Sequence, residues 1–313
     1  MNRKSLLPVE AVQSIPHLYE QFKQLSATLN DRRNARSAIG DRIRKSSQDK
    51  DTRAVQDVLE DAKKLKQELI EHERQVSELE EKLHTIALAI PNDTHPDSPV
   101  GPASSAVILS THGPVPTPPS PIRDHVDVGR ELSLLEFDAG STVTGSSWYY
   151  LMNEAALLEV ALINYALSIA IKHGFTPITT PDVIRADIAS RCGFQPRDQS
   201  DSLLSQMYSV ATSSNPSAPE LVLAGTAEIP LAGMFANRIY PETSLPIKVV
   251  GLGHAFRAEA GARGHDTRGL YRVHQFTKLE LFAVTANDAS YEMMEFMKQV
   301  QVEILEGLGF PFK

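Results

Sequence analysis

The sequence predicts an α+β fold in which an antiparallel α-helical coiled-coil arm precedes a domain built on an antiparallel β-sheet flanked by helices. Heptad-spaced apolar residues run from 18 to 90, whereas residues 247–282 alternate apolar and polar side chains around a glycine-rich loop. A proline-rich stretch separates the two patterns. With 313 residues, the chain has room for two domains and a sizeable core.

The N-terminal heptads predict two long helices that pair with each other. Apolar residues recur at spacings of three and four from Leu18 to Leu29 and again at Ile39 and Ile43, with Arg32 and Arg36 interrupting this first seam. The second seam runs from Val55 to Ile90, and only His72 in it is polar. The polar residues between the two runs favour a short tip and an antiparallel hairpin. The second helix, with about 36 residues at 1.5 Å each, would reach about 54 Å. We expect His72 to pack in the seam rather than to bind a ligand.

Basic residues gather in the distal half of the first helix and at the tip, although the whole chain is acidic. The sequence has 31 Lys and Arg against 39 Asp and Glu, a formal net charge of −8. A local basic strip is nevertheless what contacts with nucleic-acid phosphates require, and its members here are Arg32, Arg33, Arg36, Arg42, Arg44 and Lys45. The arm is therefore either a dimerisation rod or a probe that binds a long polyanion.

The proline-rich stretch predicts a linker. Residues 91–122 hold nine of the chain's 20 prolines, with Ser, Thr and Gly between them, a composition typical of semi-extended chain. We therefore expect an arm at 1–90, a linker at 91–123 and a second domain at 124–313. Within that domain we expect helices at 127–137 and 151–173.

Composition excludes several classes of protein. One cysteine, Cys192, rules out a disulfide framework and a multi-cysteine zinc site within the chain. No apolar run is expected to be long enough to cross a membrane. Arg3 and Lys4, with no acid before Glu10, are compatible with a transit peptide or with an ordinary N-terminal lead-in.

Residues 247–282 predict two antiparallel strands joined by a long loop that contains Gly261, Gly264 and Gly269. Residues two apart on a strand share a face, so Arg257 and Glu259 should point the same way. The same rule groups Arg272, His274, Phe276, Lys278 and Glu280. A surface hairpin with a solvated, charged face is the simpler interpretation. The loop glycines argue against it, because glycine is usually kept where a ligand or the backbone comes close. The face suits a polyphosphate-plus-base ligand beside a small amine.

Three stretches of the sequence resemble the class II aminoacyl-tRNA synthetases, specifically the seryl type. The residues that resemble motif 2 are Phe256-Arg257-Ala258-Glu259, the loop from Gly261 to Leu270, and Tyr271-Arg272-Val273-His274-Gln275-Phe276. The helix at 151–173 with the strand closed by Pro181 resembles motif 1, and Thr226-Ala227-Glu228 resembles the seryl Thr-x-Glu segment. The coiled-coil arm is independently similar to the appendage that reads the long variable arm of tRNA-Ser in that family.

The resemblance implies a serine–tRNA ligase: L-serine is activated by ATP to seryl-adenylate and then transferred to tRNA-Ser. It implies that Arg257 grips the α-phosphate and the serine carboxylate as the catalytic residue. Thr226, Glu228 and Glu280 would form the rest of the serine pocket. ATP would be held by Arg257, Glu259, Arg272, Val273 and Phe276, with the ring of Phe276 under adenine. From the sequence alone, Thr226 also suits a cap near the N-terminus of a helix that runs to about Asn237, and the two roles are compatible because a helix N-terminus favours a nearby anion.

The resemblance also implies partners and a cofactor. ATP acts as substrate with Mg²⁺, L-serine and tRNA-Ser bind, and motif 1 forms a homodimer; no residue of this chain is assigned as a metal ligand, and no membrane is expected. Arg32, Arg33, Arg36 and Arg42 would contact the tRNA. The compartment would be the cytoplasm or the mitochondrial matrix, with Arg3 and Lys4 favouring the second.

In the family, strands that carry a magnesium-binding acid, and then motif 3, follow the point that corresponds to Lys313. We therefore expect a C-terminally truncated catalytic domain without motif 3. The alternative is a catalytically impaired truncated or regulatory tRNA-binding relative that kept the arm. A carrier-protein aminoacylating relative, or a prolyl or threonyl synthetase, is disfavoured by the heptads at 55–90.

Overall fold

The structure is a computed structural model that describes residues 8–48, 52–90, 94–116, 124–194, 207–211, 218–259 and 268–313. The chain divides into two compact units, Met1–Val107 and Ile108–Lys313. The predicted linker at 91–123 spans this boundary, and its residues 91–93 and 117–123 lie outside the described residues. Each unit has its own core and is considered by itself.

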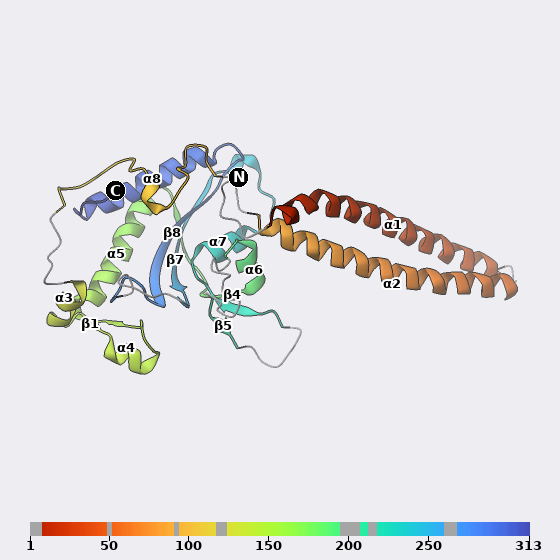
Figure 1. Cartoon of the computed structure of the whole chain (residues 1–313), viewed down its shortest axis with the longest axis horizontal. Helices are drawn as coiled ribbons and strands as arrows, with labels where there is room; N and C mark the ends of the chain where they lie inside the picture. Colours follow the sequence, from red (N-terminus) through yellow and green to blue (C-terminus); the bar gives the residue numbers. More distant parts are fainter. Residues whose placement is uncertain are drawn as a thin grey trace. The chain divides into compact units, whose positions relative to one another are not determined.

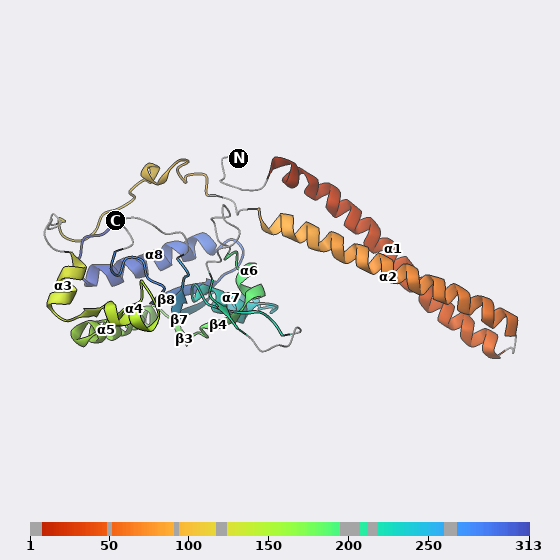
Figure 2. The ribbon, with the colours of Figure 1, turned by 60° about the horizontal axis from the view of Figure 1, so that its bottom comes forward.

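The first unit contains the predicted helical hairpin. Helices α1 (Val9–Gln48) and α2 (Thr52–Leu88) run side by side in every view (Figures 1 and 2). Leu29, Leu65 and Leu69 are buried where the heptads predict the seam, and each is less than a tenth exposed. The antiparallel hairpin is thus confirmed, because apolar side chains at heptad spacing leave water only by facing the partner helix.

Two details of the hairpin go beyond the heptad pattern. Helix α1 begins at Val9 and includes Pro16, whereas the apolar seam begins at Leu18. The polar residue in the seam, His72, is half-buried, and its Nδ1 lies 2.7 Å from the carbonyl oxygen of Glu68. His72 therefore packs in the seam, as expected from its heptad position.

The second unit is an α+β domain, as predicted. Its short 3₁₀ helix η2 spans Glu242–Ser244, whereas the other 3₁₀ helix, η1 (Ala103–Ser105), belongs to the first unit. The strands are β1 (Leu135–Glu136), β2 (Tyr150–Leu151), β3 (Thr176–Thr179), β4 (Val183–Arg185), β5 (Ser209–Val210), β6 (Leu221–Leu223), β7 (Ile247–Phe256) and β8 (Gln275–Val284). The helices are α3 (His125–Glu131), α4 (Asp138–Val143), α5 (Asn153–Lys172), α6 (Ala186–Arg191), α7 (Glu228–Phe235) and α8 (Ser290–Gly307).

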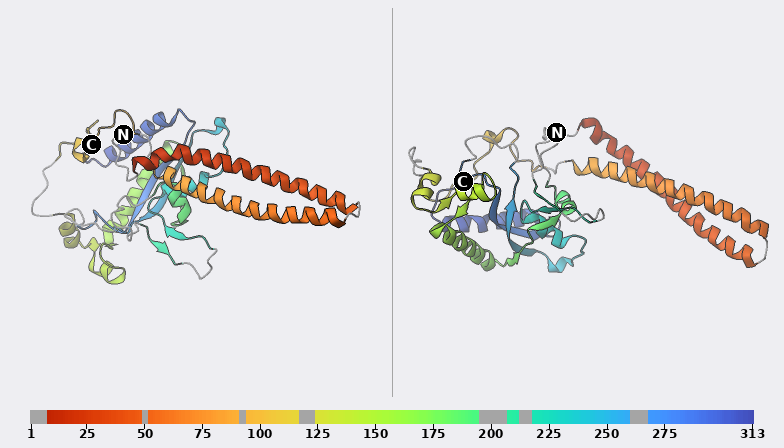
Figure 3. Two further views of the ribbon diagram at one scale, coloured as in Figure 1. Left: turned by 45° about the vertical axis from the view of Figure 1, so that its right-hand side comes forward. Right: turned by 90° about the horizontal axis from the view of Figure 1, so that it is seen from below.

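The central sheet has the order β3-β7-β8. Strands β7 and β8 pair antiparallel over ten residues each, from Ile247 opposite Val284 to Phe256 opposite Gln275. They form the long blue pair of strands in Figure 3. Strand β3 adds parallel to β7, with Thr176 opposite Val249. The antiparallel pair predicted from residues 247–282 is confirmed.

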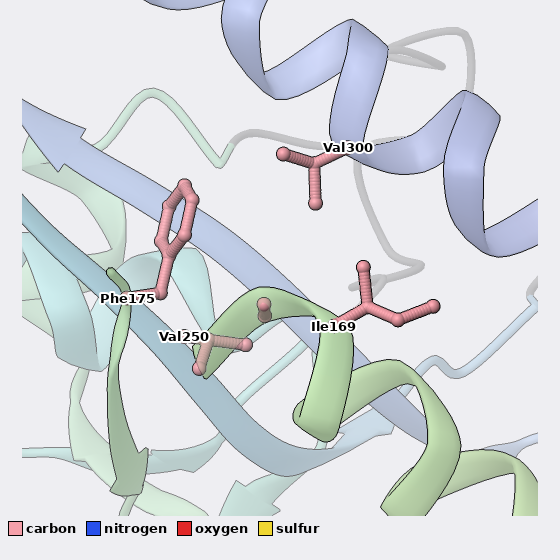
Figure 4. Packing of buried hydrophobic residues seen from close by; sticks show 5 residues of the cluster. Ile169, Phe175, Val250 and Val300 are labelled. Carbon is pink, nitrogen blue, oxygen red and sulfur yellow. The ribbon is translucent and has the colours of Figure 1, made fainter. Parts of the chain in front are cut away.

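Helices α5 and α8 cover one face of this sheet. Figure 4 shows Val300 of α8 and Ile169 of α5 directed toward the same core as Phe175 and Val250. Val250 and Val300 are fully buried. Because side chains alternate along β7, burying Val250 on this side presents Val249, Gly251 and Gly253 on the opposite face.

The opposite face of β7 and β8 meets α7. Phe235 of α7 stacks on Phe282 of β8, with ring centroids 5.8 Å apart. A second sheet, β4-β6-β5, lies beside α6 and α7, and its core holds Ile184, Val222 and Ile229. The segment that carries the predicted serine residues therefore comes from between this small sheet and α7.

The helix expected at 127–137 is wrong in its second half. Helix α3 ends at Glu131, and Leu135–Glu136 forms strand β1, which pairs with β2. The left-handed backbone of Ser133, with φ of 56°, turns the chain between them. The helix expected at 151–173 begins at Asn153, and Gly174, with φ of 81°, follows its last turn as the glycine cap predicts.

Within the described residues, α5 is a helix long and apolar enough to cross a membrane by length and composition, with 20 residues and a mean hydropathy of 1.6. The expectation that no segment would meet this criterion is therefore wrong. One side of α5 packs on the sheet and α8 through Ile169 and Ala170. One such helix is weak evidence for a span, since helices that pack against other proteins share its composition.

Candidate functional site

The site lies on the face of β7 and β8 that α5 and α8 leave uncovered. Phe276, Lys278 and Glu280 alternate along β8 with residues that enter the core, so these three side chains share this face. Directly opposite, β7 contributes Gly251 and Gly253. A Cβ at Gly253 would lie 2.4 Å from Oγ1 of Thr180, so only glycine fits this close approach beneath the site.

The shared face is shorter than the sequence predicted. Strand β8 begins at Gln275, so Arg272 and His274 precede it and do not continue its alternation. His274 turns away from Phe276: its Nδ1 lies 2.8 Å from the hydroxyl of Tyr208, and its ring stacks on Trp148 at 5.7 Å. The expectation that all five residues from 272 to 280 lie on one strand is therefore wrong: Arg272 and His274 precede β8, although Arg272 still lines one cavity with Phe276.

Arg257 follows the last residue of β7 and extends over the site. Its guanidinium carbon lies 5.1 Å from the centre of the Phe276 ring, a cation–π arrangement, and its Nε donates to the carbonyl oxygen of Gly225 at 3.4 Å. The Arg257 N–H also donates to the carbonyl oxygen of His274 at 2.9 Å. The two candidate ligand-binding side chains, Arg257 and Phe276, thus meet on one face.

Glu259 and Arg272 form an ion pair between the Glu259 carboxylate and Nε of Arg272. The backbone of Glu259 is left-handed, with φ of 48°, so the chain leaves the strand alternation there. Arg257 and Glu259 are therefore not related by a regular strand, contrary to expectation. Their side chains nevertheless reach the same cavity.

One cavity of about 540 Å³ brings together all five residues predicted for ATP: Arg257, Glu259, Arg272, Val273 and Phe276. The sequence did not predict the rest of its wall, which comes from Tyr149, Leu151, Leu270 and Tyr271. Tyr149 donates from its hydroxyl to the carbonyl oxygen of Gln275 at 3.4 Å, and burial raises the pKa of Tyr149. Tyr149 and Leu151 flank or lie on β2, far from motif 2 in sequence, so no local pattern could assign them to this wall.

The far wall of the cavity is held by α3. His125 Nε2 accepts from the Leu270 N–H at 3.0 Å, and its ring meets Tyr271 edge-on at 4.5 Å. Arg268 pairs through Nε with Asp124 Oδ2 at 2.8 Å. Gly269 packs directly against His125, while the other two predicted loop glycines, Gly261 and Gly264, lie outside the described residues.

The residues predicted for serine separate into two groups. The Thr226 hydroxyl donates to Glu280 Oε2 at 2.9 Å, and Lys278 Nζ lies 2.7 Å from the same oxygen. Glu228 contributes its N–H, 3.4 Å from Thr226 Oγ1, but its side chain is exposed. Its charge acts instead on Cys192, whose pKa is raised mainly by burial and further by Glu228. The structure thus brings Thr226 and Glu280 together and leaves the Glu228 carboxylate outside their contact.

Thr226 is not the N-cap of the following helix. Helix α7 runs from Glu228 to Phe235, Ala227 occupies the cap position, and no side chain caps it. The helix expected to reach Asn237 therefore stops two residues earlier. The hydroxyl of Thr226 donates to Glu280 of β8 and also accepts from the N–H of Glu228, the first residue of α7, so it contacts both the site face and the start of the helix.

The arginines predicted for tRNA lie on α1, and their environments differ. Arg32 pairs with Glu68 at 2.9 Å and Arg33 with Glu73 at 3.0 Å, both across the hairpin. Arg36 is exposed. Arg42 lies in α1, but its side chain is outside the described residues.

Comparisons with known proteins agree with the arm and with the site, each taken by itself. Residues 2–94 match the seryl-tRNA synthetase N-terminal domain, and residues 208–313 match the class II tRNA synthetase core domain (G, H, P, S and T). The serine–tRNA ligase of Treponema denticola is 36% identical over 295 residues, covering 94% of this chain and 68% of the relative. The chain belongs to the seryl-tRNA synthetase family.

Further members of the seryl-tRNA synthetase family show the same extent of similarity. The mitochondrial serine–tRNA ligase of Saccharomyces cerevisiae is 35% identical over 97% of this chain and 66% of its own length. The seryl-tRNA synthetase of Pyrococcus horikoshii, solved in complex with ATP, superposes with a TM-score of 0.74 at 30% identity, covering 97% of this chain and 70% of that one. The chain spans about two thirds of the length of these seryl-tRNA synthetases.

Proposed function

We propose that this protein is a serine–tRNA ligase that activates L-serine with ATP and transfers the seryl group to tRNA-Ser. The observation that carries the proposal is the single cavity that unites Arg257, Glu259, Arg272, Val273 and Phe276. Membership of the seryl-tRNA synthetase family supports the same reaction. The Pyrococcus horikoshii neighbour, solved with ATP, supports ATP as the substrate.

The first step needs positioning and charge more than covalent help from the protein. A serine carboxylate oxygen attacks the α-phosphorus, the new P–O bond forms, and pyrophosphate leaves along the opposite direction. Arg257 neutralises the charge that develops on the α-phosphate, since a planar guanidinium can bind two phosphate oxygens at once. Arg272 holds the outer phosphates, and adenine stacks on Phe276 with Glu259 accepting from its amino group.

These roles require two contacts seen within the site to be exchanged for contacts with ATP. The Arg257 guanidinium now lies over the Phe276 ring, where adenine would stack, and Arg272 is paired with Glu259. A triphosphate outcompetes the one carboxylate of Glu259 for Arg272, whose own side chain is half exposed, because the triphosphate carries more charge. ATP binding therefore draws both arginines from these internal partners onto the phosphates.

Mg²⁺ enters this proposal with ATP. Among the described residues, no group of three or more His, Cys, Asp or Glu side chains is close enough to hold a metal ion. Mg²⁺ in nucleotide sites commonly keeps several waters and binds the substrate phosphates with one or two carboxylates. In this proposal the phosphates of ATP and water hold the ion, and no residue of the cavity is assigned to it. The ion would neutralise charge on the leaving pyrophosphate.

The arm is the proposed binding surface for tRNA-Ser. Arg32, Arg33 and Arg36 follow one another along the exposed surface of α1. Arg32 and Arg33 pair with glutamates across the hairpin at more than 30% side-chain exposure on each partner, so these pairs can open to phosphates at little cost.

The proposed oligomer is a homodimer formed through α5 and β3. The outer face of α5 exposes Leu157, Leu158, Val160 and Leu162, each at least 40% accessible to solvent. Beside it, β3 is an edge strand of the central sheet. A contiguous apolar helix face next to an open strand edge favours an interface with a second protein surface. A two-fold axis here would bury both features at once.

The cytoplasm and the mitochondrial matrix are the proposed compartments. Both bacterial and mitochondrial serine–tRNA ligases are similar to this chain at nearly the same identity. Arg3 and Lys4 favour the matrix.

The test of the proposed function is serine-dependent ATP–pyrophosphate exchange. We expect the chain to exchange pyrophosphate with serine but not with threonine or proline, and Arg257→Ala to abolish the exchange while the fold stays intact. Arg185→Ala is the matched control, since Arg185 is exposed and pairs with Asp187 away from the cavity. Exchange unaffected by Arg257→Ala would refute the role of Arg257. Binding of tRNA-Ser with no exchange by the unmodified chain would instead support a non-catalytic tRNA-binding relative.

A further inference from the structure

Lys278 occupies the centre of the site face, between the cavity and the proposed serine pocket. Its Nζ lies 2.7 Å from Glu280 Oε2 and donates to Thr226 Oγ1 at 3.1 Å. The Thr226 hydroxyl donates to the same carboxylate oxygen at 2.9 Å. An ammonium, a hydroxyl and a carboxylate thus form a closed triangle of contacts.

The triangle uses the full hydrogen-bonding capacity of Thr226. A hydroxyl has one proton to donate and two lone pairs to accept. The proton is donated to Glu280, and the lone pairs face Lys278 and the Glu228 N–H. Thr226 is only 6% exposed, so water has little access to replace these partners. Lys278 therefore helps to fix the direction in which the hydroxyl donates its proton.

The triangle engages one oxygen of Glu280 only. Both contacts go to Oε2, and nothing among the described residues forms a hydrogen bond with Oε1. The last torsion of a glutamate is broad, so a carboxylate without partners samples many orientations. Two donors on Oε2 restrict that rotation and leave Oε1 with its accepting capacity. When a ligand binds Oε1, the Glu280 side chain then loses less conformational entropy.

We propose that Lys278 is a positioning residue of the serine pocket. Its ammonium holds Glu280 and Thr226 in the arrangement that receives the ammonium and hydroxyl groups of the substrate. This inference rests on the proposed function, since the ligand it concerns is serine. Lys278 should therefore affect the affinity for serine and not the affinity for ATP, because Lys278 does not line the cavity that holds the proposed ATP contacts.

The opposite possibility is that Lys278 competes with the substrate. A lysine ammonium paired with Glu280 could occupy the position that the serine ammonium needs. Removal of Lys278 would then strengthen serine binding, whereas removal of a positioning residue weakens it. The sign of the change separates the two roles.

The experiment measures two affinities by calorimetry on the full chain: ATP alone, and serine in the presence of a saturating non-hydrolysable ATP analogue. We expect Lys278→Met to raise the serine Kd by about tenfold, the change that follows from loss of one hydrogen bond to a charged group. The ATP Kd should stay within about twofold, a difference below the free energy of one such bond. Lys278→Arg keeps the charge and the donors and should lose less serine affinity than Lys278→Met.

The matched control is Lys248→Met. Lys248 lies on the neighbouring strand but on the core-facing side, where its Nζ donates to the carbonyl oxygen of His173 at 2.7 Å. Its removal changes the net charge equally and should leave the serine Kd unchanged. Thermal unfolding checks that each variant folds. If Lys278→Met does not fold, Lys278→Gln, which keeps a donor without the charge, replaces it and should also weaken serine binding.

Unchanged or tighter serine binding in the folded Lys278 variants would overturn the inference, as would an equal loss of ATP affinity. Serine affinity lost equally in Lys278→Arg and Lys278→Met would do the same. Failure of the unmodified chain to bind serine would refute the proposed function itself, and the inference with it. The two failures are therefore distinguishable by the behaviour of the unmodified chain.

Discussion

Arg257 and His274 are joined by two hydrogen bonds, one between their main chains and one between the His274 ring and the Arg257 carbonyl oxygen. The Arg257 N–H donates to the carbonyl oxygen of His274 at 2.9 Å, and Nδ1 of His274 lies 2.9 Å from the carbonyl oxygen of Arg257. These contacts extend the β7–β8 pairing one residue beyond the ladder that ends at Phe256 and Gln275. His274 therefore fixes where the backbone of Arg257 leaves the sheet, and with it the origin of the guanidinium.

The first prediction concerns His274→Ala. Loss of the imidazole removes the hydrogen-bond partner of the Arg257 carbonyl oxygen and the stacking partner of Trp148. The guanidinium of Arg257 should therefore be less well positioned. We expect the rate of pyrophosphate exchange at saturating ATP and serine to fall by about tenfold to a hundredfold, the loss that follows from misplacing a catalytic group by about 1 Å. Steady-state exchange kinetics measure it.

Tyr208→Phe is the control for His274→Ala. It removes the hydroxyl 2.8 Å from His274 Nδ1 but keeps the ring and leaves the contact with Arg257 intact. Its exchange rate should stay within about threefold of the original, a change smaller than the free energy of one neutral hydrogen bond. An exchange rate in His274→Ala equal to that of the unmodified chain would show that the ladder alone positions Arg257.

The sequence predicted the residues of the nucleotide cavity better than their geometry. Phe276 and Glu280 share a face because the alternation of a strand is local and enforced by the ladder. The positions of Arg272 and His274 could not be predicted, because both residues precede β8, which begins at Gln275. His274 is positioned instead by contacts with Ser147, Trp148 and Tyr208. Those partners are distant in sequence, so no local pattern carries their positions.

The helical arm was more fully predictable than the second unit. Its buried leucines obey a heptad that needs no information from elsewhere in the chain. In the second unit, the helix expected through Phe137 ends at Glu131 because the residues after it form β1, which pairs with β2. The periodicity of apolar residues does not reveal such a pairing. The role of α3 in supporting Leu270 and Tyr271 was likewise invisible from the sequence.

The second prediction is a pH dependence at α3. The N–H of Asp127, followed by the charge of Arg268 and the N–H of Val126, lowers the pKa of Asp124 below its usual value. A lowered folded-state pKa gives stability that is present above the unfolded-state value and is lost as pH falls through the folded-state pKa. Unfolding of the second unit should therefore become easier below about pH 4, the usual value of an aspartate.

Urea unfolding between about pH 3 and 6, the range around the usual aspartate pKa, measures this effect in Asp124→Asn and the unmodified chain. An asparagine keeps an acceptor for the helix N–H groups but loses the pairing with Arg268. The variant should be less stable than the unmodified chain above pH 4, with the difference shrinking at lower pH. The control is Asp288→Asn, at an exposed position. A difference that is constant across the whole range would contradict this role of Asp124.

The third prediction concerns the outer face of α5. Leu157 is 71% exposed, so replacing it by a charged residue costs the isolated chain little but would leave an unpaired charge in a dimer interface. We expect Leu157→Glu to convert a dimer to a monomer. Light scattering after gel filtration measures the mass. Leu109→Glu, at a residue 87% exposed, is the control and should remain dimeric. A dimer that survives Leu157→Glu would place the interface elsewhere.

The fourth prediction concerns the arm. Arg36→Ala should weaken tRNA-Ser binding and lower the slope of log affinity against log salt by about one, as expected for the loss of one phosphate contact. Filter binding over a salt series measures both quantities. The control is Arg74→Ala: Arg74 lies on α2 and pairs with Glu71 and Glu78 on its own helix. A salt slope unchanged by Arg36→Ala would argue that the arm serves only as a structural rod.

A structure of the chain with a non-hydrolysable seryl-adenylate analogue tests the central claim most directly. We predict density for the adenine against the Phe276 ring, for the phosphate at the Arg257 guanidinium, and for the seryl group beside Thr226 and Glu280. Density for the analogue anywhere other than on this face of β7 and β8 would contradict the account.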